Sequence, residues 1–152
     1  DLMFDWNNLF LSCPHCNNMK NQKKYDGHII DCCKEDPEAS ICQELIDGHV
    51  VVTSIVSTDK AARTAQLLTE CFEKQNTGIR EYECSTRVEA LEATMTTLYR
   101  CLANYKKKPN TRNYRALRGM LSRGHKFAGF TRTYVRKHID EYPELNELVA
   151  IA

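Results

Sequence analysis

The clearest pattern along the chain is a stripe of apolar residues between positions 88 and 105. Its spacings alternate between three and four residues, which places the whole set on one face of an α-helix. Thr86, followed three residues later by Glu89, has the form of a capping box and predicts that this helix begins there. The helix is expected to pack against a core through Val88, Leu91, Met95, Leu98, Leu102 and Tyr105.

A second amphipathic pattern covers residues 58 to 74. Thr58 and Asp59 are both suited to cap a helix, because their side-chain oxygens can accept a hydrogen bond from a free backbone N–H group. The turn residues of Asn76-Thr77-Gly78 are expected to end this helix. Its predicted buried face has spacings of four, three and four residues and consists of Ala61, Ala65, Leu68 and Phe72.

The remaining predicted elements are shorter. A valine-rich run over residues 49–56 predicts a β-strand, and residues 29–31 are a candidate for another short strand. Asp36 followed by Pro37 predicts a helix start, with Asp at the N-cap and Pro at the first helical position. Further helices are predicted over residues 17–24, 111–122, 127–140 and 144–152.

Composition and length fit a globular protein. Apolar residues make up 42% of the 152 positions and charged residues 27%, which argues against a disordered chain. The most apolar stretch, residues 50–56, is far shorter than the ~20 residues of a membrane span, so no membrane association is expected. The first residues lack the basic and apolar regions of a signal peptide. We therefore expect a cytoplasmic location and free thiols such as Cys71 and Cys101.

The net charge of +1 conceals an uneven distribution. Eleven Lys or Arg residues and no acidic residue lie between Lys106 and His138, while ten basic and twenty acidic residues lie elsewhere. Such a segment predicts either a polyanion partner or basic helices packed on acidic parts of the same chain. Core packing is expected for the interleaved aromatic residues, with base stacking as the alternative. The predicted nucleic-acid contacts in this segment, residues 106–138, are Lys106, Lys107, Lys108, Arg112, Arg115, Arg118, Arg123, Lys126 and Arg132.

The first candidate for specific chemistry is Cys13-Pro14-His15-Cys16. Two cysteines separated by two residues at a tight turn can hold one side of a tetrahedral zinc ion. His15 lies between them and is expected to point to solvent rather than to bind metal. A complete site needs two further ligands, which could come from a second cysteine pair upstream of residue 1 or from His28, Cys32, Cys33 and Cys42.

The surrounding residues resemble the second half of an HNH nuclease motif. Asn7-Asn8-Leu9 leads through a short apolar run into the two cysteines, and the second cysteine is followed directly by Asn17 and then by Lys20. In HNH enzymes a β-hairpin and a helix wrap one divalent cation, an arrangement called ββα-metal. The resemblance implies metal-dependent hydrolysis of phosphodiester bonds in DNA or RNA.

The same resemblance implies a role for each matching residue. Asn8 corresponds to the loop asparagine that orients the general-base histidine, and Asn17 to the metal ligand at the start of the helix, with Mg²⁺ or Mn²⁺ as the catalytic cation. Lys20 matches a lysine near the phosphate. Cys13 and Cys16 match one pair of a four-cysteine structural zinc site. The general-base histidine and the other cysteine pair are expected upstream of residue 1.

The resemblance is densest to the HNH subunits, termed PtuB, of bacterial Septu anti-phage systems, which also occur as retron effectors. It covers about residues 4–38, including Ile29-Ile30-Asp31-Cys32 and Asp36-Pro37-Glu38. It implies an α+β chain whose residues 1–40 complete a zinc-stapled HNH module and whose residues 41–152 form a helical domain with one short strand. The implied partners are a PtuA-like ATPase of the ABC or SMC type, nucleic acid and, as a further candidate, a retron reverse transcriptase with its DNA–RNA product.

Two other functions remain open from the sequence. Cys-Pro-His-Cys also occurs in strongly oxidising thiol–disulfide oxidoreductases, where a helix N-terminus lowers the pKa of the first thiol. However, the alternating strands and helices of a thioredoxin-like fold are not predicted here. The other alternative is a zinc-stapled binding module that has no catalytic centre.

Overall fold

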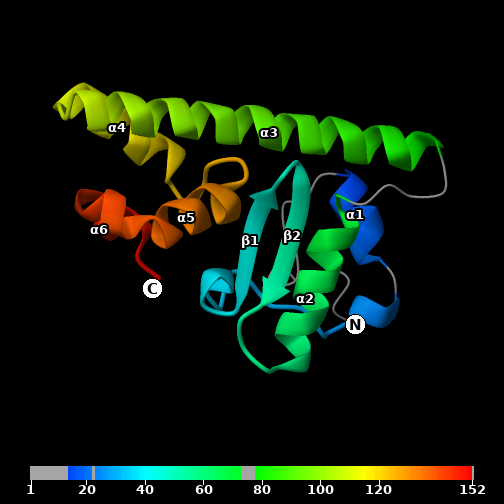
Figure 1. The fold of residues 1–152 in the computed structure, drawn as a ribbon. Coiled ribbons are helices and arrows are strands. Elements are labelled where there is room, and N and C mark those ends of the chain that lie inside the picture. The colour runs from blue at the N-terminus through cyan, green and yellow to red at the C-terminus, as the bar shows by residue number, and fades with distance from the viewer. Residues whose placement is uncertain (1–13, 22, 73–77, 152) are drawn as a thin grey trace.

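The computed structural model describes residues 14–21, 23–72 and 78–151. In this part of the chain the fold is α+β, with most residues in helices and a two-stranded antiparallel sheet (Figure 1). The α-helices and strands are α1 (Pro14–Lys20), β1 (Ile41–Ile46), β2 (His49–Ser54), α2 (Asp59–Glu70), α3 (Gly78–Lys107), α4 (Thr111–Met120), α5 (Ala128–Lys137) and α6 (Asn146–Val149). Short 3₁₀ helices are η3 (Lys23–Tyr25), η4 (Pro37–Ala39), η5 (Ile139–Glu141) and η6 (Pro143–Leu145).

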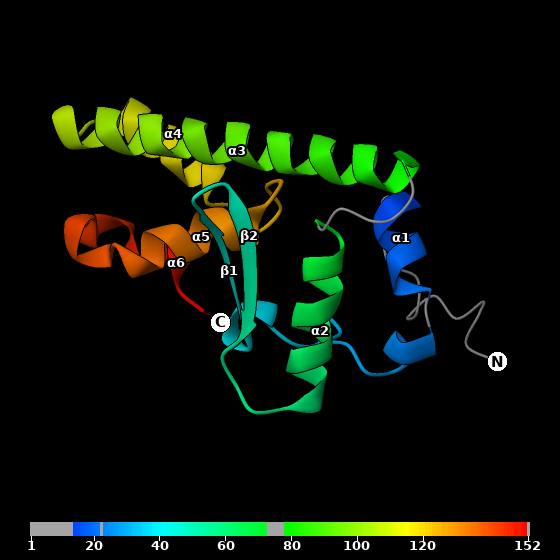
Figure 2. The same ribbon diagram turned by 45° about the vertical axis from the view of Figure 1, so that its right-hand side comes forward.

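Helix α3 is the longest element and runs along one side of the molecule (Figures 1 and 2). Its 30 residues extend about 45 Å at 1.5 Å per residue. The predicted stripe is confirmed, since Leu91 and Leu98 are fully buried. The predicted start at Thr86 is wrong, because Cys84 is also fully buried and continues the stripe by one more step of four residues.

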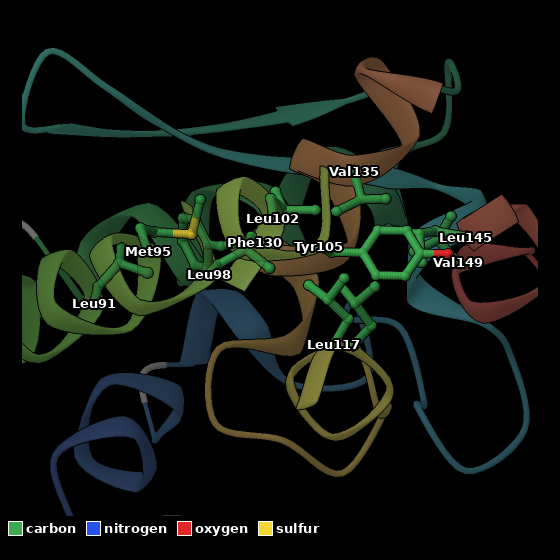
Figure 3. Packing of buried hydrophobic residues seen from close by; sticks show 11 residues of the cluster. Leu91, Met95, Leu98, Leu102, Tyr105, Leu117, Phe130, Val135, Leu145 and Val149 are labelled. Atoms are coloured by element: carbon green, nitrogen blue, oxygen red, sulfur yellow. The ribbon is translucent and has the colours of Figure 1, made fainter. Parts of the chain in front are cut away.

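The main core lies between the second half of α3 and the helices that follow it. Side chains from α4, α5, η6 and α6 meet the stripe of α3 in one cluster (Figure 3). Each of these helices is short and buries only a few side chains, so its stability depends on this tertiary packing. The core members beyond α3 are Leu117, Leu121, Phe130, Val135, Leu145 and Val149.

The sheet is a hairpin, and its first strand was missing from the sequence prediction. The predicted strand at 49–56 is confirmed as β2, and β1 pairs with it from Ile41 opposite Ser54 to Ile46 opposite His49. Asp47 and Gly48 form the connection with φ angles of 50° and 78°, as a two-residue hairpin turn of the I′ type requires. An Asp-Gly pair between two apolar runs is the signal that predicts such a hairpin.

Two smaller apolar clusters join the first part of the chain to the hairpin and α2. Met19 of α1 packs with Tyr25, Leu67 and Cys71. Ile30 packs with Ile41, Ala61 and Ala65, and its backbone N–H donates to the Thr64 hydroxyl at 2.9 Å. The predicted strand at residues 29–31 is therefore wrong: Ile30 is anchored by α2 and not by a neighbouring strand.

The shorter helices follow the prediction closely. Thr58 caps α2 by accepting from the Ala61 N–H, and Asp36 caps η4 by accepting from the Glu38 N–H at 3.1 Å. Helices α4 and α5 lie within the predicted ranges, while α1 begins three residues earlier than predicted. Within the described ranges, no helix combines the length and the apolar composition that a bilayer-spanning segment requires.

Candidate functional site

Helix α1 carries the described part of the HNH-like motif. It begins at Pro14, and its exposed residues include Asn17 and Asn18. His15 and Met19 are four positions apart and are both buried, so they form the face that attaches α1 to the rest of the molecule. Asn17 and Lys20 are three positions apart and therefore share another face. Asn8 and Cys13 lie outside the described residues.

The prediction that His15 points to solvent is wrong. Its Nδ1 lies 2.7 Å from Oε2 of Glu83 on α3, and its Nε2 lies 3.1 Å from the carbonyl oxygen of Cys71, at the C-terminal cap of α2. The side chain is only 6% exposed. His15 therefore links α1 to the end of α2 and to α3. Its four-residue spacing from Met19 was the sequence signal for this buried face.

Cys16 is the described member of the proposed zinc pair. It is half-buried and packs against the cluster that contains Met19 and Cys71. The described residues contain no group of three or more His, Cys, Asp or Glu side chains that could hold a metal. For the predicted zinc site they would supply the Cys16 thiol, while Cys13 lies outside the described residues.

Cys32 and Cys42, two of the alternative zinc ligands, have raised thiol pKa values. Burial raises the pKa of Cys42, and the nearby Glu44 carboxylate raises this pKa further. Burial likewise raises the pKa of Cys32, with a smaller effect from Cys33. In the metal-free protein both thiols therefore hold their protons more tightly than a free cysteine does, and a bound zinc ion would itself favour the thiolate.

About half of the basic side chains in residues 106–138 contact other residues of the chain. Arg123 makes a two-pronged contact with Asp36, with both N···O distances at 2.9 Å. Lys106 pairs with Glu141 at 2.9 Å, and Lys126 lies over the ring of Phe127. The two ion pairs correspond to the alternative of internal charge complementarity, and they reduce the positive charge that is free to meet a polyanion.

Arg132 must be removed from the predicted nucleic-acid contacts. It is 3% exposed, and its Nε donates to Glu38 at 2.7 Å. Its terminal nitrogens donate to the carbonyl oxygens of Leu121, Leu148 and Ala150. A buried guanidinium that is bonded to one carboxylate and three carbonyl oxygens cannot approach a phosphate without breaking these bonds.

Sequence reasoning did not identify Glu38 as a central residue. Its carboxylate accepts from Arg132 and from Arg136, and Arg136 also donates to the Val149 carbonyl at 3.1 Å. Glu38 is 9% exposed, and buried charges of this kind are normally paired. A lone Glu after Asp-Pro gives no sequence signal for a partner ninety-four positions away.

The remaining basic side chains form a surface that we call the α4 ridge, at the end of α3 and along α4. All of its members are exposed, and in the described part of the chain none pairs with a carboxylate. No acidic residue occurs between positions 93 and 139 to neutralise it. The ridge consists of Lys107, Lys108, Arg112, Arg115 and Arg118.

The aromatic residues of the basic segment serve mainly in packing. Tyr105 and Phe130 are buried in the main core, as the packing interpretation predicts. Phe127 contacts the rings of Phe72 and Phe130, with centroids 6.1 and 6.3 Å apart. These rings are thereby committed to neighbours within the chain, and the α4 ridge relies on charge for any nucleic-acid binding.

Comparison of the chain with protein-family models, with curated proteins and with solved structures finds no match.

Proposed function

We propose that this chain is the larger part of a metal-dependent HNH nuclease subunit that hydrolyses phosphodiester bonds of nucleic acid. The observation that carries the proposal is the exposure of Asn17 on the first turns of α1, directly after Cys16 in an HNH-like motif. The buried contacts of His15 fix the orientation of α1 against α2 and α3. Asn17 is consequently presented to solvent from a rigidly attached helix.

Two metal ions with different roles belong to the proposal. Cys13 and Cys16 would hold a structural zinc ion together with two ligands upstream of residue 1. Asn17 would bind a catalytic Mg²⁺ or Mn²⁺, which supplies charge stabilisation at the leaving oxygen. The exposed amide of Asn17 offers an oxygen ligand of the type these cations accept.

The chain's own residues act on the phosphate and on the substrate backbone. Lys20 shares a face with Asn17, and its ammonium can stabilise negative charge that develops on a phosphate held there. Asn8 would orient the general-base histidine. The α4 ridge adds affinity that depends on salt and is indifferent to sequence.

The family resemblance adds proposed partners. We place the subunit in a cytoplasmic anti-phage complex with an ABC- or SMC-type ATPase of the PtuA kind, and with a retron reverse transcriptase and its DNA–RNA product as a further candidate. Most charged side chains outside the main core are exposed, so they are available to contact such partners.

The test compares two neighbouring asparagines in the protein of full natural length. Asn17→Ala and Asn18→Ala change the same residue type at two exposed positions of the same helix. The proposal predicts cleavage that requires Mg²⁺ or Mn²⁺, a loss of at least about a hundredfold in Asn17→Ala, and near-normal cleavage in Asn18→Ala. Unfolding curves of both variants should match the unmodified protein.

Three results would point elsewhere. Equal activity of the two variants would remove Asn17 from the catalytic centre. Zinc binding without cleavage under any metal condition would favour a binding module. A reversible disulfide between Cys13 and Cys16 in a metal-free protein would favour the oxidoreductase.

A further inference from the structure

Cys32 and Cys33 are two adjacent thiols on the surface, in the turn that precedes η4. Both side chains are exposed, whereas the other free cysteines of residues 14–21, 23–72 and 78–151 are half-buried or buried. A thiol-directed ligand that arrives from solvent therefore has easier access to this pair than to the other described thiols. The pair lies outside helix α1, and its chemistry does not depend on the proposed nuclease function.

Asp31 holds the turn that carries the two thiols. Its carbonyl oxygen accepts from the N–H groups of Lys34 and Glu35, both at 2.9 Å. Cys32 and Cys33 are therefore the two central residues of a β-turn. The Asp31 carboxylate also accepts from the Cys33 N–H at 3.0 Å and pairs with Lys34 at 2.9 Å. Both the backbone and a side chain of this segment thus keep the turn in one conformation.

The chain is also anchored on each side of the turn. The backbone N–H of Ile30 donates to the Thr64 hydroxyl at 2.9 Å. Asp36 caps η4 and accepts from both terminal nitrogens of Arg123 at 2.9 Å. A ligand therefore meets two thiols that are already held together, which lowers the entropy lost on binding.

A direct bond between the two sulfurs is disfavoured by the spacing of the backbone. Consecutive Cα atoms are about 3.8 Å apart across a trans peptide, while disulfides usually join Cα atoms about 4.4–6.8 Å apart. A disulfide between neighbouring residues is consequently strained and easily reduced. A ligand atom that bonds to both sulfurs lies between them and does not require the sulfurs to approach so closely.

The number of available donors indicates the class of ligand. A structural zinc ion takes four ligands, and the described residues contain no group of three or more His, Cys, Asp or Glu side chains that could hold a metal. An organic trivalent arsenical, R–As=O, needs only two thiols, because its own organic group fills the third valence of arsenic. Trivalent arsenic is also soft and prefers sulfur to oxygen or nitrogen.

We propose that Cys32 and Cys33 form a dithiol site that chelates organic trivalent arsenicals. In this reaction two S–H bonds and the As=O bond break, two As–S bonds form, and the oxygen leaves with both protons as water. Arsenic stays trivalent, so no oxidant or reductant takes part. The pKa of Cys32 is raised by burial and, to a smaller extent, by Cys33, so this thiol brings its own proton to the water that leaves.

The test adds phenylarsine oxide to the reduced, zinc-loaded protein of full natural length and locates the adduct by mass spectrometry of its peptides. The expected adduct lies on the peptide that contains Cys32 and Cys33. Dithiothreitol removes it, whereas glutathione at the same thiol concentration does not, because two linked bonds must be replaced together. Cys32→Ser and Cys33→Ser each weaken binding by on the order of a hundredfold or more. Cys101→Ser changes a half-buried cysteine and provides the control, with unchanged binding.

Three results would overturn the proposal. Equal affinity in Cys32→Ser, Cys33→Ser and the unmodified protein would show that one thiol is sufficient. An adduct found only on other cysteines would remove the site. Protection of Cys32 and Cys33 by bound zinc would assign these thiols to the zinc ion instead. Because both positions are exposed, circular dichroism spectra of the two serine variants should match the unmodified protein, and a loss of binding then reports on the thiols alone.

Discussion

Arg132 donates from Nε to Oε1 of Glu38 at 2.7 Å, and both side chains are buried. The pair connects the segment that follows the HNH-like motif to helix α5. Through the other nitrogens of Arg132 it also holds the carbonyl oxygens of Leu148 and Ala150 near the end of the chain. The segment around Glu38 and the end of the described chain are thus both bonded to one arginine.

Replacing Glu38 with Gln should destabilise the protein strongly. The substitution keeps the size of the side chain but leaves Arg132 as a buried charge without its counter-ion, which typically costs about 3–5 kcal/mol. Urea unfolding followed by circular dichroism measures this loss. Lys106→Met, which breaks the exposed pair with Glu141, should leave the midpoint nearly unchanged. Equal losses of stability in the two variants would show that the buried Glu38 contributes no more than an exposed ion pair does.

Replacing His15 with Ala should loosen α1. The substitution removes the contacts to Glu83 and to the Cys71 carbonyl, with an expected loss of about 1–3 kcal/mol. Hydrogen exchange should accelerate at the amides of α1 before those of α3. His28 is exposed and provides the control, since His28→Ala removes a similar side chain without a buried contact. Uniform exchange rates in α1 and α3 after the His15 change would contradict this assignment.

The stripe on α3 should account for much of the stability. Leu98 is fully buried in the main core, so Leu98→Ala is expected to cost about 2–5 kcal/mol through lost burial and the cavity that remains. Tyr82 lies on the same helix with 73% of its surface exposed, and Tyr82→Ala should change stability by less than about 0.5 kcal/mol. Thermal unfolding of the two variants compares buried and exposed positions of one helix directly.

The ion pair at the C-terminal end of α3 should be visible as a shifted titration. A hydrogen bond from Lys106, supported by its charge, lowers the pKa of Glu141 below the ordinary 4.5. The pair therefore stabilises the fold above this ordinary pKa, and its contribution disappears as the pH falls through the lowered value. In an NMR titration the Glu141 midpoint should return toward 4.5 in Lys106→Ala. It should stay low in Lys107→Ala, which changes a neighbouring lysine that makes no such pair.

Local sequence patterns predicted most of the helices but did not predict the contacts between the helices. The three-and-four spacing identified α3, yet the capping box at Thr86 placed its start too late, because burial of Cys84 extends the helix beyond a local signal. Strand β1 has little alternation and was missed, although Asp47-Gly48 marks the hairpin turn. The pairing of Arg132 with Glu38 depends on tertiary structure alone, so charge counting assigned that arginine to the surface.

The candidate site was predictable only through its motif. The order of Cys16, Asn17 and Lys20 suggested HNH chemistry, and the helical spacing of His15 and Met19 indicates which face of α1 is buried. Spacing alone cannot reveal that the partners of His15 come from the C-terminal cap of α2 and from Glu83. The contact with Glu83 spans 68 positions of the sequence and the contact with Cys71 spans 56.

Native mass spectrometry of the reduced protein, prepared in its full natural length, tests the central claim most directly. We expect one tightly bound zinc ion per chain, loss of this zinc and of the attachment of α1 in Cys16→Ser, and unfolding of the same region by a strong chelator. The contradictory result is a metal-free protein of unchanged fold in which Cys13 and Cys16 form a reversible disulfide.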